Sequence, residues 1–460
     1  MCRGLSLTFT SLLAIYLAFS LNRFLFTDTQ DHVLYGVIFD AGSTGSRARV
    51  YKQRSKLGTA ASQTHFYVIV LLILDAERCR YKLVSEEAFT VEPGLSEFAR
   101  FPHASVAYLR PLLDQARACI PKHKRALTPL VLRATAGLRL LPERIANTLL
   151  QSVHNLLNTS GFHLASQEVV SIMDGIDEGF FAWISLLFLN QQSCLASYHP
   201  QSPFTEAVIH HQAIFDLGGA SFQLTFGVTT DAGPSEYVHN IPSVYLGTQF
   251  SPPSGKFFAR SYLGLGLVTA MHSMFLHSSN RSTASISNHL LSPCFPTNFT
   301  GSWNHGGKKW TVSHGFEGRQ SLPGNVFNEC FETAVNVITE RELGANRVKD
   351  LEGLKQLEIQ ATSFMCSKTE EAAKLLISGP ADGRVPVQWY FDAARKACST
   401  PLLERPFLCT ELTYISALLS HGFGLPVDKC LNLNRTIGDI EIGWPVGFLV
   451  DILLRCFLTG

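Results

Sequence analysis

Two short loops rich in glycine and hydroxyl side chains constrain the fold of this chain, because each is opened by an aspartate that follows an apolar run. The loops span Asp40–Arg47 (DAGSTGSR) and Asp216–Gln223 (DLGGASFQ) and lie about 175 residues apart. Each loop leads into a further β-prone run, Ala48–Tyr51 or Leu224–Phe226. Each therefore predicts a strand, a tight turn and a second strand, and the repetition predicts two similar halves.

The residue types in these loops suit an anion and its metal. Small residues let backbone N–H groups approach an anion, and hydroxyls add donors. An aspartate at the mouth can hold a cation or its waters. Neither loop fits the G-x-x-x-x-G-K-[ST] pattern of P-loops, and neither opens a helix as G-x-G-x-x-G does. One such loop alone is an ordinary hairpin turn, but two in the same order predict a polyphosphate and its metal held between two lobes.

Length and composition narrow the class of protein. A chain of 460 residues exceeds one ordinary core and suggests two domains. Hydrophobic residues make up 46% and charged residues 16%, which excludes a disordered chain. The formal net charge of +1 argues against a nucleic-acid-binding protein.

The N-terminus predicts entry into the secretory pathway. Residues Leu5–Leu21 carry no charge and lie between Arg3 and Arg23. Residues 1–24 are thus a cleaved signal peptide, with Ala18–Ser20 as the small-x-small site, or an uncleaved signal anchor. The eleven cysteines fit an oxidising compartment. Four N-x-[ST] sequons also fit lumenal exposure: Asn158, Asn280, Asn298 and Asn434.

The hydrophobic pattern predicts an α/β protein. Helical spacing covers 104–120, 143–157, Phe181–Leu189 and the closing segment Trp444–Leu458, whereas Pro129–Leu132 and Glu168–Met173 are predicted strands. We expect a first lobe at 33–165, to which a C-terminal helix at 440–458 returns, and a second lobe at 166–439. The site is expected between the halves, at the carboxyl ends of strands. Residues 52–85 are predicted to be irregular, and the apolar run Phe66–Leu74 within them is an insertion or an unspliced remnant.

Glu178 is the carboxylate best placed for chemistry. It lies at a strand-to-helix junction, where the helix dipole alone favours an acid. The dipole is also expected to keep Glu178 ionised at neutral pH, as a general base must be. Hydrolysis of a phosphoanhydride needs a base for water, a metal and donors for the developing charge, and Glu178, the two aspartates and the two loops offer one group for each role.

This combination resembles the apyrases, or nucleoside triphosphate diphosphohydrolases. The matching segments stand in family order: Phe39–Gly45 (FDAGSTG), Ala134–Arg139 (ATAGLR), Ser171–Gly179 (SIMDGIDEG) with Trp183, and Asp216–Ser221 (DLGGAS), extended by Ser261–Gly266 (SYLGLG) and Asp439–Trp444 (DIEIGW). The likeness is greatest to the lumenal nucleoside diphosphatase branch. It implies two actin/sugar-kinase-like (ribonuclease H-like) lobes with the nucleotide in the cleft. It also implies hydrolysis of UDP and GDP with Ca²⁺ or Mg²⁺ in the endoplasmic reticulum or Golgi, or after secretion, in support of glycosylation.

The resemblance implies a role for each matching residue. Glu178 matches the catalytic base, and Ser221 and Gln223 match the residues that position the attacking water. Asp40 and Asp216 match those that hold the metal, largely through its waters. The phosphate positions are Ser43, Thr44 and Gly45 in the first loop, Gly218, Gly219 and Ala220 in the second, and Arg47 and Thr135 nearby. Two disulfides are implied as well, Cys294–Cys330 and Cys398–Cys409.

The family's aromatic cluster that stacks on the base is changed here. The corresponding stretch is Ile359–Cys366, in which Phe364 is the remaining ring. Base–aromatic stacking contributes about 1–3 kcal/mol, so base affinity is weakened, or Trp389 or Tyr390 substitutes, unless these two rings simply pack a helix. Pro445 also replaces the small residue usual after the tryptophan. Two other functions stay open: a sugar or acetate kinase-like phosphotransferase, and a non-catalytic glycoprotein of the same fold.

Overall fold

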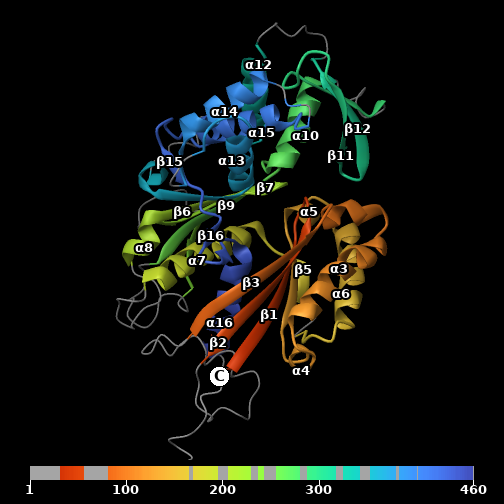
Figure 1. The fold of residues 1–460 in the computed structure, drawn as a ribbon, viewed down its shortest axis with the longest axis vertical. Coiled ribbons are helices and arrows are strands. Elements are labelled where there is room, and N and C mark those ends of the chain that lie inside the picture. The colour runs from red at the N-terminus through yellow and green to blue at the C-terminus, as the bar shows by residue number, and fades with distance from the viewer. Residues whose placement is uncertain are drawn as a thin grey trace, which may run out of the picture.

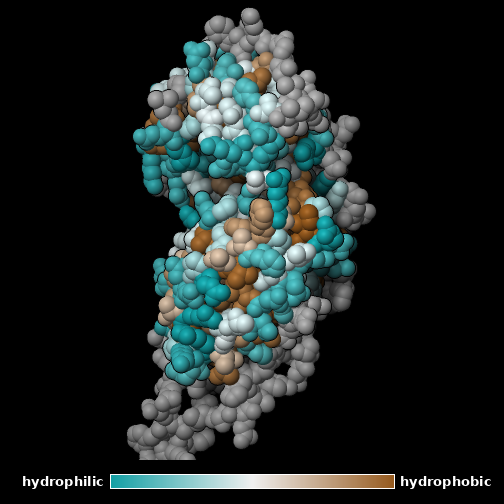
Figure 2. Space-filling model, turned by 90° about the vertical axis from the view of Figure 1, so that its right-hand side faces the viewer, coloured by the Kyte–Doolittle hydropathy of each residue, from teal (hydrophilic) through white to brown (hydrophobic). Residues whose placement is uncertain are grey.

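A computed structural model describes residues 32–55, 81–164, 169–194, 206–228, 237–242, 255–279, 287–316, 325–341, 353–379, 383–400, 402 and 404–458. The N-terminal segment 1–24 and the apolar run Phe66–Leu74 lie outside these residues. The chain forms two lobes, each built around its own mixed sheet (Figure 1). Figure 2 shows the surface hollowed between the two lobes.

The first lobe contains a five-stranded sheet in the order β3-β2-β1-β4-β5. Its strands are β1 His32–Ala41, β2 Ser46–Ser55, β3 Tyr81–Val91, β4 Leu130–Ala134 and β5 Val170–Ile172. Strand β1 pairs antiparallel with β2 and parallel with β4. Val37, Ile38 and Phe39 of this strand are buried, as expected for a central strand covered on both faces.

Helices cover this sheet and connect it to the rest of the molecule. They are η1 Leu95–Arg100, α3 Ala104–Cys119, α4 Lys122–Arg125, α5 Ala136–Arg139, α6 Glu143–Asn158, α7 Gly175–Cys194 and α16 Trp444–Leu458. Helices α3 and α6 pack against each other beside the sheet, and α16 returns from the end of the chain to lie against β1, with Leu449 next to Gly36 (Figure 1). Helix α7 packs on α16 and also on β6, β7 and β9 of the second sheet. It therefore holds its first turn, which carries Glu178, between the two lobes.

The second lobe contains a seven-stranded sheet in the order β14-β15-β13-β6-β7-β9-β8. Its strands are β6 Gln212–Leu217, β7 Ser221–Val228, β8 Val238–Asn240, β9 Lys256–Leu263, β13 Glu358–Ser363, β14 Arg384–Pro386 and β15 Cys430–Asn432. Its helices are α8 Glu206–His211, α10 Leu267–Ser278, α12 Val326–Glu340, α13 Phe364–Leu375, α14 Val387–Ser399, α15 Leu408–Ala417 and the π-helical turn η5 Leu418–Gly422. A separate small sheet is formed by β10 His289–Ser292, β11 Thr300–His305 and β12 Lys308–His314, and β16 Thr436–Ile437 pairs with β17 Ile440–Glu441.

The two sheets share one topology, which confirms the two similar halves predicted from the repeated loops. Strands β3-β2-β1-β4-β5 correspond in order to β9-β7-β6-β13-β15. Each set has two antiparallel pairings on one side of its first strand and two parallel pairings on the other. The loops at Asp40 and Asp216 therefore occupy the same place, the turn of the β1–β2 and β6–β7 hairpins.

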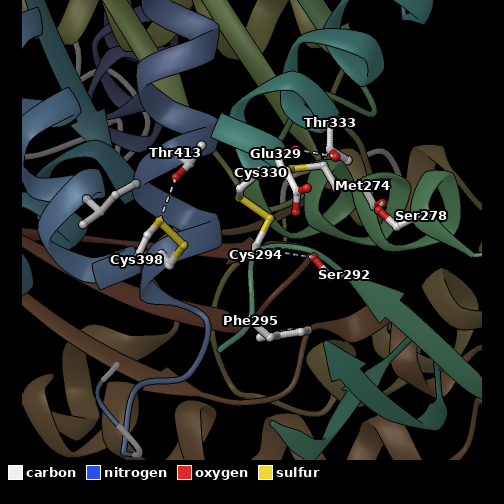
Figure 3. The surroundings of a disulfide bond; sticks show 12 residues. Met274, Ser278, Ser292, Cys294, Phe295, Glu329, Cys330, Thr333, Cys398 and Thr413 are labelled. Carbon is white, nitrogen blue, oxygen red and sulfur yellow. Dashed lines mark hydrogen bonds between the residues drawn. A yellow bond between two sulfur atoms is a disulfide. The ribbon is translucent and has the colours of Figure 1, made fainter. Parts of the chain in front are cut away.

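Both implied disulfides are present. Cys294 is bonded to Cys330 and Cys398 to Cys409, with Cα–Cα distances of 4.8 and 4.7 Å. Figure 3 shows Cys294–Cys330 beside Cys398, so the two bonds lie near each other in the second lobe. They tie the segment after β10 to α12 and the end of α14 to α15.

Some predicted boundaries are wrong. Residues 52–85 are not irregular at their ends, because β2 continues to Ser55 and β3 begins at Tyr81, and the two strands pair there. The matching segment Ala134–Arg139 includes the short helix α5. Helices α3, α6, α7 and α16 confirm the predicted helices, and α7 extends beyond the predicted Phe181–Leu189 at both ends. The boundary expected between residues 165 and 166 stays a prediction, although β5 pairs with β4 in the first sheet.

Candidate active site

The first loop places Asp40 beside the guanidinium of Arg47. Asp40 lies directly opposite Arg47 in the β1–β2 hairpin, and its Oδ2 is 3.7 Å from Arg47 Nη1. Burial raises the pKa of Asp40, Arg47 and Arg49 oppose the rise, and the charge of Asp216 adds to it. The indole of Trp444 also hydrogen-bonds to this carboxylate. The charges of the two predicted metal-holding aspartates, one from each lobe, therefore act on each other.

The second loop approaches the first so closely that a side chain at Gly219 would displace side chains of the first loop. A Cβ atom on Gly219 would lie 2.5 Å from Ser43 Oγ and 2.6 Å from Thr44 Cγ2. The structure thus brings both predicted phosphate loops together. Thr135 is buried nearby, and its backbone N–H donates to the carbonyl oxygen of Ala41 at 3.2 Å.

Asp216 is held by hydroxyl groups. Thr362 Oγ1 donates to Asp216 Oδ1 at 3.2 Å, and the side chain of Ser363 also hydrogen-bonds to it. Burial raises the pKa of Asp216, while these two hydrogen bonds and Arg47 lower it. Ser363 adopts a φ of 56° at the end of β13, a left-handed conformation that side chains rarely take.

Glu178 lies at the centre of a buried hydrogen-bonded cluster. Its Oε2 is 2.6 Å from Arg139 Nη2 and 3.0 Å from Gln223 Nε2. The same amide nitrogen is 2.6 Å from Ser221 Oγ and 3.2 Å from Ser261 Oγ, and Arg139 Nη2 is 3.2 Å from Ser221 Oγ. Ser221 and Gln223 come from β7, Ser261 from the paired strand β9, and Arg139 from α5 of the other lobe. The three predicted catalytic residues are thus brought together.

The expectation that the helix dipole keeps Glu178 ionised is wrong. Burial raises the pKa of Glu178 to about 7, against the opposing effect of Arg139 and with further rises from Asp216 and Asp40. A dipole acts within one helical turn, whereas loss of water acts on the whole carboxylate. A pKa near neutrality suits a general base, because the group must both hold and release a proton at the working pH.

Sequence reasoning missed four polar residues of the site. Arg139 and Ser261 stand inside matched motifs but were given no role, and Thr362 and Ser363 fall in the stretch compared with the base-stacking cluster. The position of Arg139 at the end of ATAGLR was the available signal. Nothing local to Thr362 or Ser363 indicates that β13 pairs with β6 beside Asp216.

Tyr390 is excluded as a substitute ring for the base. Its side chain is fully buried, and its hydroxyl is 2.8 Å from Thr369 Oγ1, so it packs α14 into the core. Trp389 is partly buried, and its indole donates to the carbonyl oxygen of Ser378. Phe364 is also partly buried against the core of the second lobe.

The described residues contain neither a ready-made metal-binding cluster nor a membrane-spanning helix. No group of three or more His, Cys, Asp or Glu side chains is arranged there to hold a metal ion. None of the helices in the described ranges combines the length and the apolar character that crossing a membrane requires.

Comparisons with known proteins identify the family to which the chain is similar. The model of the GDA1/CD39 (nucleoside phosphatase) family matches residues 26–346. Ectonucleoside triphosphate diphosphohydrolase 6 of Rattus norvegicus is 32% identical over 445 residues, covering 93% of this chain and 84% of the relative. Nucleoside-diphosphatase uda-1 of Caenorhabditis elegans is 29% identical over 423 residues, covering 90% and 80%.

A solved structure agrees in fold. The crystal structure of nucleoside triphosphate hydrolases from Neospora caninum aligns with a TM-score of 0.60 at 14% identity, covering 98% of this chain and 97% of that one. The two lobes thus have the actin/sugar-kinase-like fold. The chain belongs to the GDA1/CD39 (nucleoside phosphatase) family, and it is a hydrolase acting on phosphoanhydrides.

Proposed function

We propose that this protein is a divalent-metal-dependent nucleoside diphosphatase of the secretory lumen. It hydrolyses UDP and GDP, and triphosphates more weakly, to the monophosphate and phosphate, and so supports glycoprotein processing. The observation that carries the proposal is the buried cluster of Glu178, Ser221 and Gln223 beside two facing loops. The relative from C. elegans, named a nucleoside-diphosphatase, supports the choice of diphosphates.

Glu178 acts as the general base in this proposal. Arg139 and Gln223 both contact its Oε2, which leaves Oε1 to take the proton of the attacking water. Ser221 Oγ and the amide of Gln223 hold that water next to the carboxylate. Because Arg139 contacts both Glu178 and Ser221, it fixes the base relative to the water site. Water in such a place favours hydrolysis over transfer to a sugar or acetate.

Asp40 and Asp216 would hold Ca²⁺ or Mg²⁺, largely through its waters. Both carboxylates are buried, the charge of Asp216 raises the pKa of Asp40, and oxygen donors suit these hard cations. When bound, the metal neutralises charge on the phosphate oxygens.

Backbone and side-chain donors would hold the phosphates. They are Ser43, Thr44 and Gly45 in the first loop and Gly218, Gly219 and Ala220 in the second, with Arg47 and Thr135 beside them. Their closeness across the cleft is what supports this assignment.

Surface asparagines support the lumenal setting. Asn158, Asn298 and Asn434, three of the four sequon positions, are exposed, so they are accessible for glycosylation. The two disulfides also fit an oxidising compartment.

Phosphate release by the secreted, purified protein tests the proposal. UDP, GDP, ADP, UTP and ATP are each supplied with Ca²⁺, with Mg²⁺ or with EDTA, and with no acceptor sugar present. We expect release from UDP and GDP in either metal, less from the triphosphates, and none in EDTA. Full activity in EDTA would disprove the metal-dependent mechanism, and phosphate transfer only after addition of a sugar would favour a kinase.

A further inference from the structure

A hairpin of the second lobe is held by an acid of the first. Strands β11 and β12 are joined by Gly306 and Gly307, which have φ values of 64° and 66°, the left-handed pair that a two-residue hairpin turn requires. The N–H of Gly306 donates to Glu97 Oε1 at 3.0 Å, and the N–H of Gly307 donates to Glu97 Oε2. One carboxylate thus binds both free amides of the turn, and Figure 1 shows the hairpin extending from the second lobe toward the first.

On the first lobe, Glu97 is connected to the first phosphate loop. It lies in η1, which follows Gly94 directly. A Cβ atom on Gly94 would lie 2.2 Å from the carbonyl oxygen of Ser43, so the segment carrying Glu97 packs on the loop backbone. Tyr108 reinforces this contact, because its hydroxyl donates to the carbonyl oxygen of Val91 at 3.0 Å and accepts the N–H of Ser46 at 3.2 Å.

On the second lobe, stacked rings connect the hairpin to α10. His305, at the end of β11, stacks on Trp303 with ring centroids 4.8 Å apart, and it lies 4.6 Å from His272 of α10. The ring centroid of Trp310, in β12, lies 5.5 Å from that of His272.

Helix α10 begins at the second phosphate loop. The N–H of Leu267 donates to the carbonyl oxygen of Gly218, and the N–H of Val268 donates to that of Gly219, both at 2.9 Å. The contact at Glu97 therefore joins two packed segments, each of which leads to one of the loops that meet across the cleft.

We propose that Glu97 and the Gly306–Gly307 turn form a latch that keeps the two phosphate loops together, so that Glu97 is a positioning residue for substrate binding. The inference rests on the proposed function, because its kinetic consequence concerns the nucleotide. With the latch intact, the nucleotide meets loops already near their working separation. Without it, part of the binding free energy is spent on closing the lobes, which raises KM but leaves kcat of the saturated enzyme nearly unchanged.

Hydrogen exchange and kinetics of three variants test the latch. Glu97→Ala removes both acceptors, and Glu97→Gln keeps one acceptor oxygen. Glu143→Gln is the control, an exposed acid in the first turn of α6 on the same lobe. In the protein without nucleotide, we expect the hairpin amides of Glu97→Ala to exchange about tenfold faster, since hydrogen bonds to a charged acceptor are lost.

With UDP and saturating metal, we expect Glu97→Ala to raise KM about five- to tenfold with kcat within twofold. Glu97→Gln should lie between this variant and the wild type, and Glu143→Gln should match the wild type. Unchanged hairpin exchange in Glu97→Ala overturns the latch, and so does an equal effect of Glu143→Gln. If the wild type releases no phosphate from UDP, the proposed function fails, while the exchange rates still decide for or against the latch.

Discussion

The two phosphate loops occupy equivalent turns of equivalent sheets, yet they differ at one register position. The residue opposite the aspartate is Arg47 in the first loop and Gln223 in the second. Arg47 lies 3.7 Å from Asp40, whereas Gln223 contacts Glu178 and Ser221. The first loop thus has a cation for phosphate beside its aspartate, and the second has an amide that holds the base.

The difference teaches that a repeated motif does not repeat a function. Because an amide is uncharged, Gln223 can contact the Glu178 carboxylate and the Ser221 hydroxyl without adding a positive charge to that of Arg139. A guanidinium at the place of Gln223 would add a second positive charge and hold the base ionised. Three predictions test this division between a first loop that binds phosphate and a second loop that holds the base.

Loss of the base gives the largest expected effect. Glu178→Gln keeps the shape of the side chain and one acceptor oxygen but cannot take a proton. We expect phosphate release to fall about 10³-fold, while thermal stability and nucleotide affinity change little. Asp174→Asn is the matched control, since Asp174 caps the Ile176 N–H of the same helix with Oδ1 and asparagine keeps that oxygen. Near-normal turnover of Glu178→Gln would mean that another group is the base.

Loss of Arg139, whose guanidinium contacts the base, gives a smaller effect, and this effect changes the pH dependence of kcat/KM. Burial raises the pKa of Glu178 to about 7 and Arg139 opposes that rise. The active form is the carboxylate, so kcat/KM should fall as the pH drops below about 7. In Arg139→Ala the opposing charge is gone, so the pKa rises further and this acidic limb moves to higher pH.

We expect Arg139→Ala to lose about 10²-fold at neutral pH, partly recovered at higher pH. Arg139→Lys, which keeps the charge but not the fork of donors, should lie between it and the wild type. The pH dependence of kcat/KM provides the measurement. A uniform loss with no movement of the acidic limb would leave Arg139 a purely structural residue.

The sequence predicts what is local and misses what depends on long-range packing. Both loops and their strands follow from turn residues and apolar runs, and Glu178 follows from its place at the start of a helix. The contacts of Arg139 with Glu178, and of Ser261 with Gln223, join residues that are 39 and 38 positions apart. No periodicity encodes them. The pKa of Glu178 differs from the expectation for the same reason, because its burial comes from packing between the lobes.

The smallest expected effect separates the two aspartates. Asp40→Asn and Asp216→Asn each remove one charge and keep the size of the side chain. Arg47 and Arg49 already offset the charge of Asp40, whereas Asp216 is held chiefly by the hydroxyls of Thr362 and Ser363 and to a smaller extent by the charge of Arg47. Binding of the metal ion should therefore depend more on Asp216 than on Asp40. We expect the metal concentration for half-maximal activity to rise about tenfold in Asp216→Asn and about threefold in Asp40→Asn.

A metal titration of the thermal transition without nucleotide checks the same order apart from catalysis. Larger sensitivity of Asp40→Asn in both titrations would place the cation on the first lobe. Arg47 would then leave the charge of Asp40 available to the metal, and the first loop would hold the metal as well as the phosphate. The division between the loops would in that case rest on Gln223 alone, because Gln223 is the register partner that contacts the base.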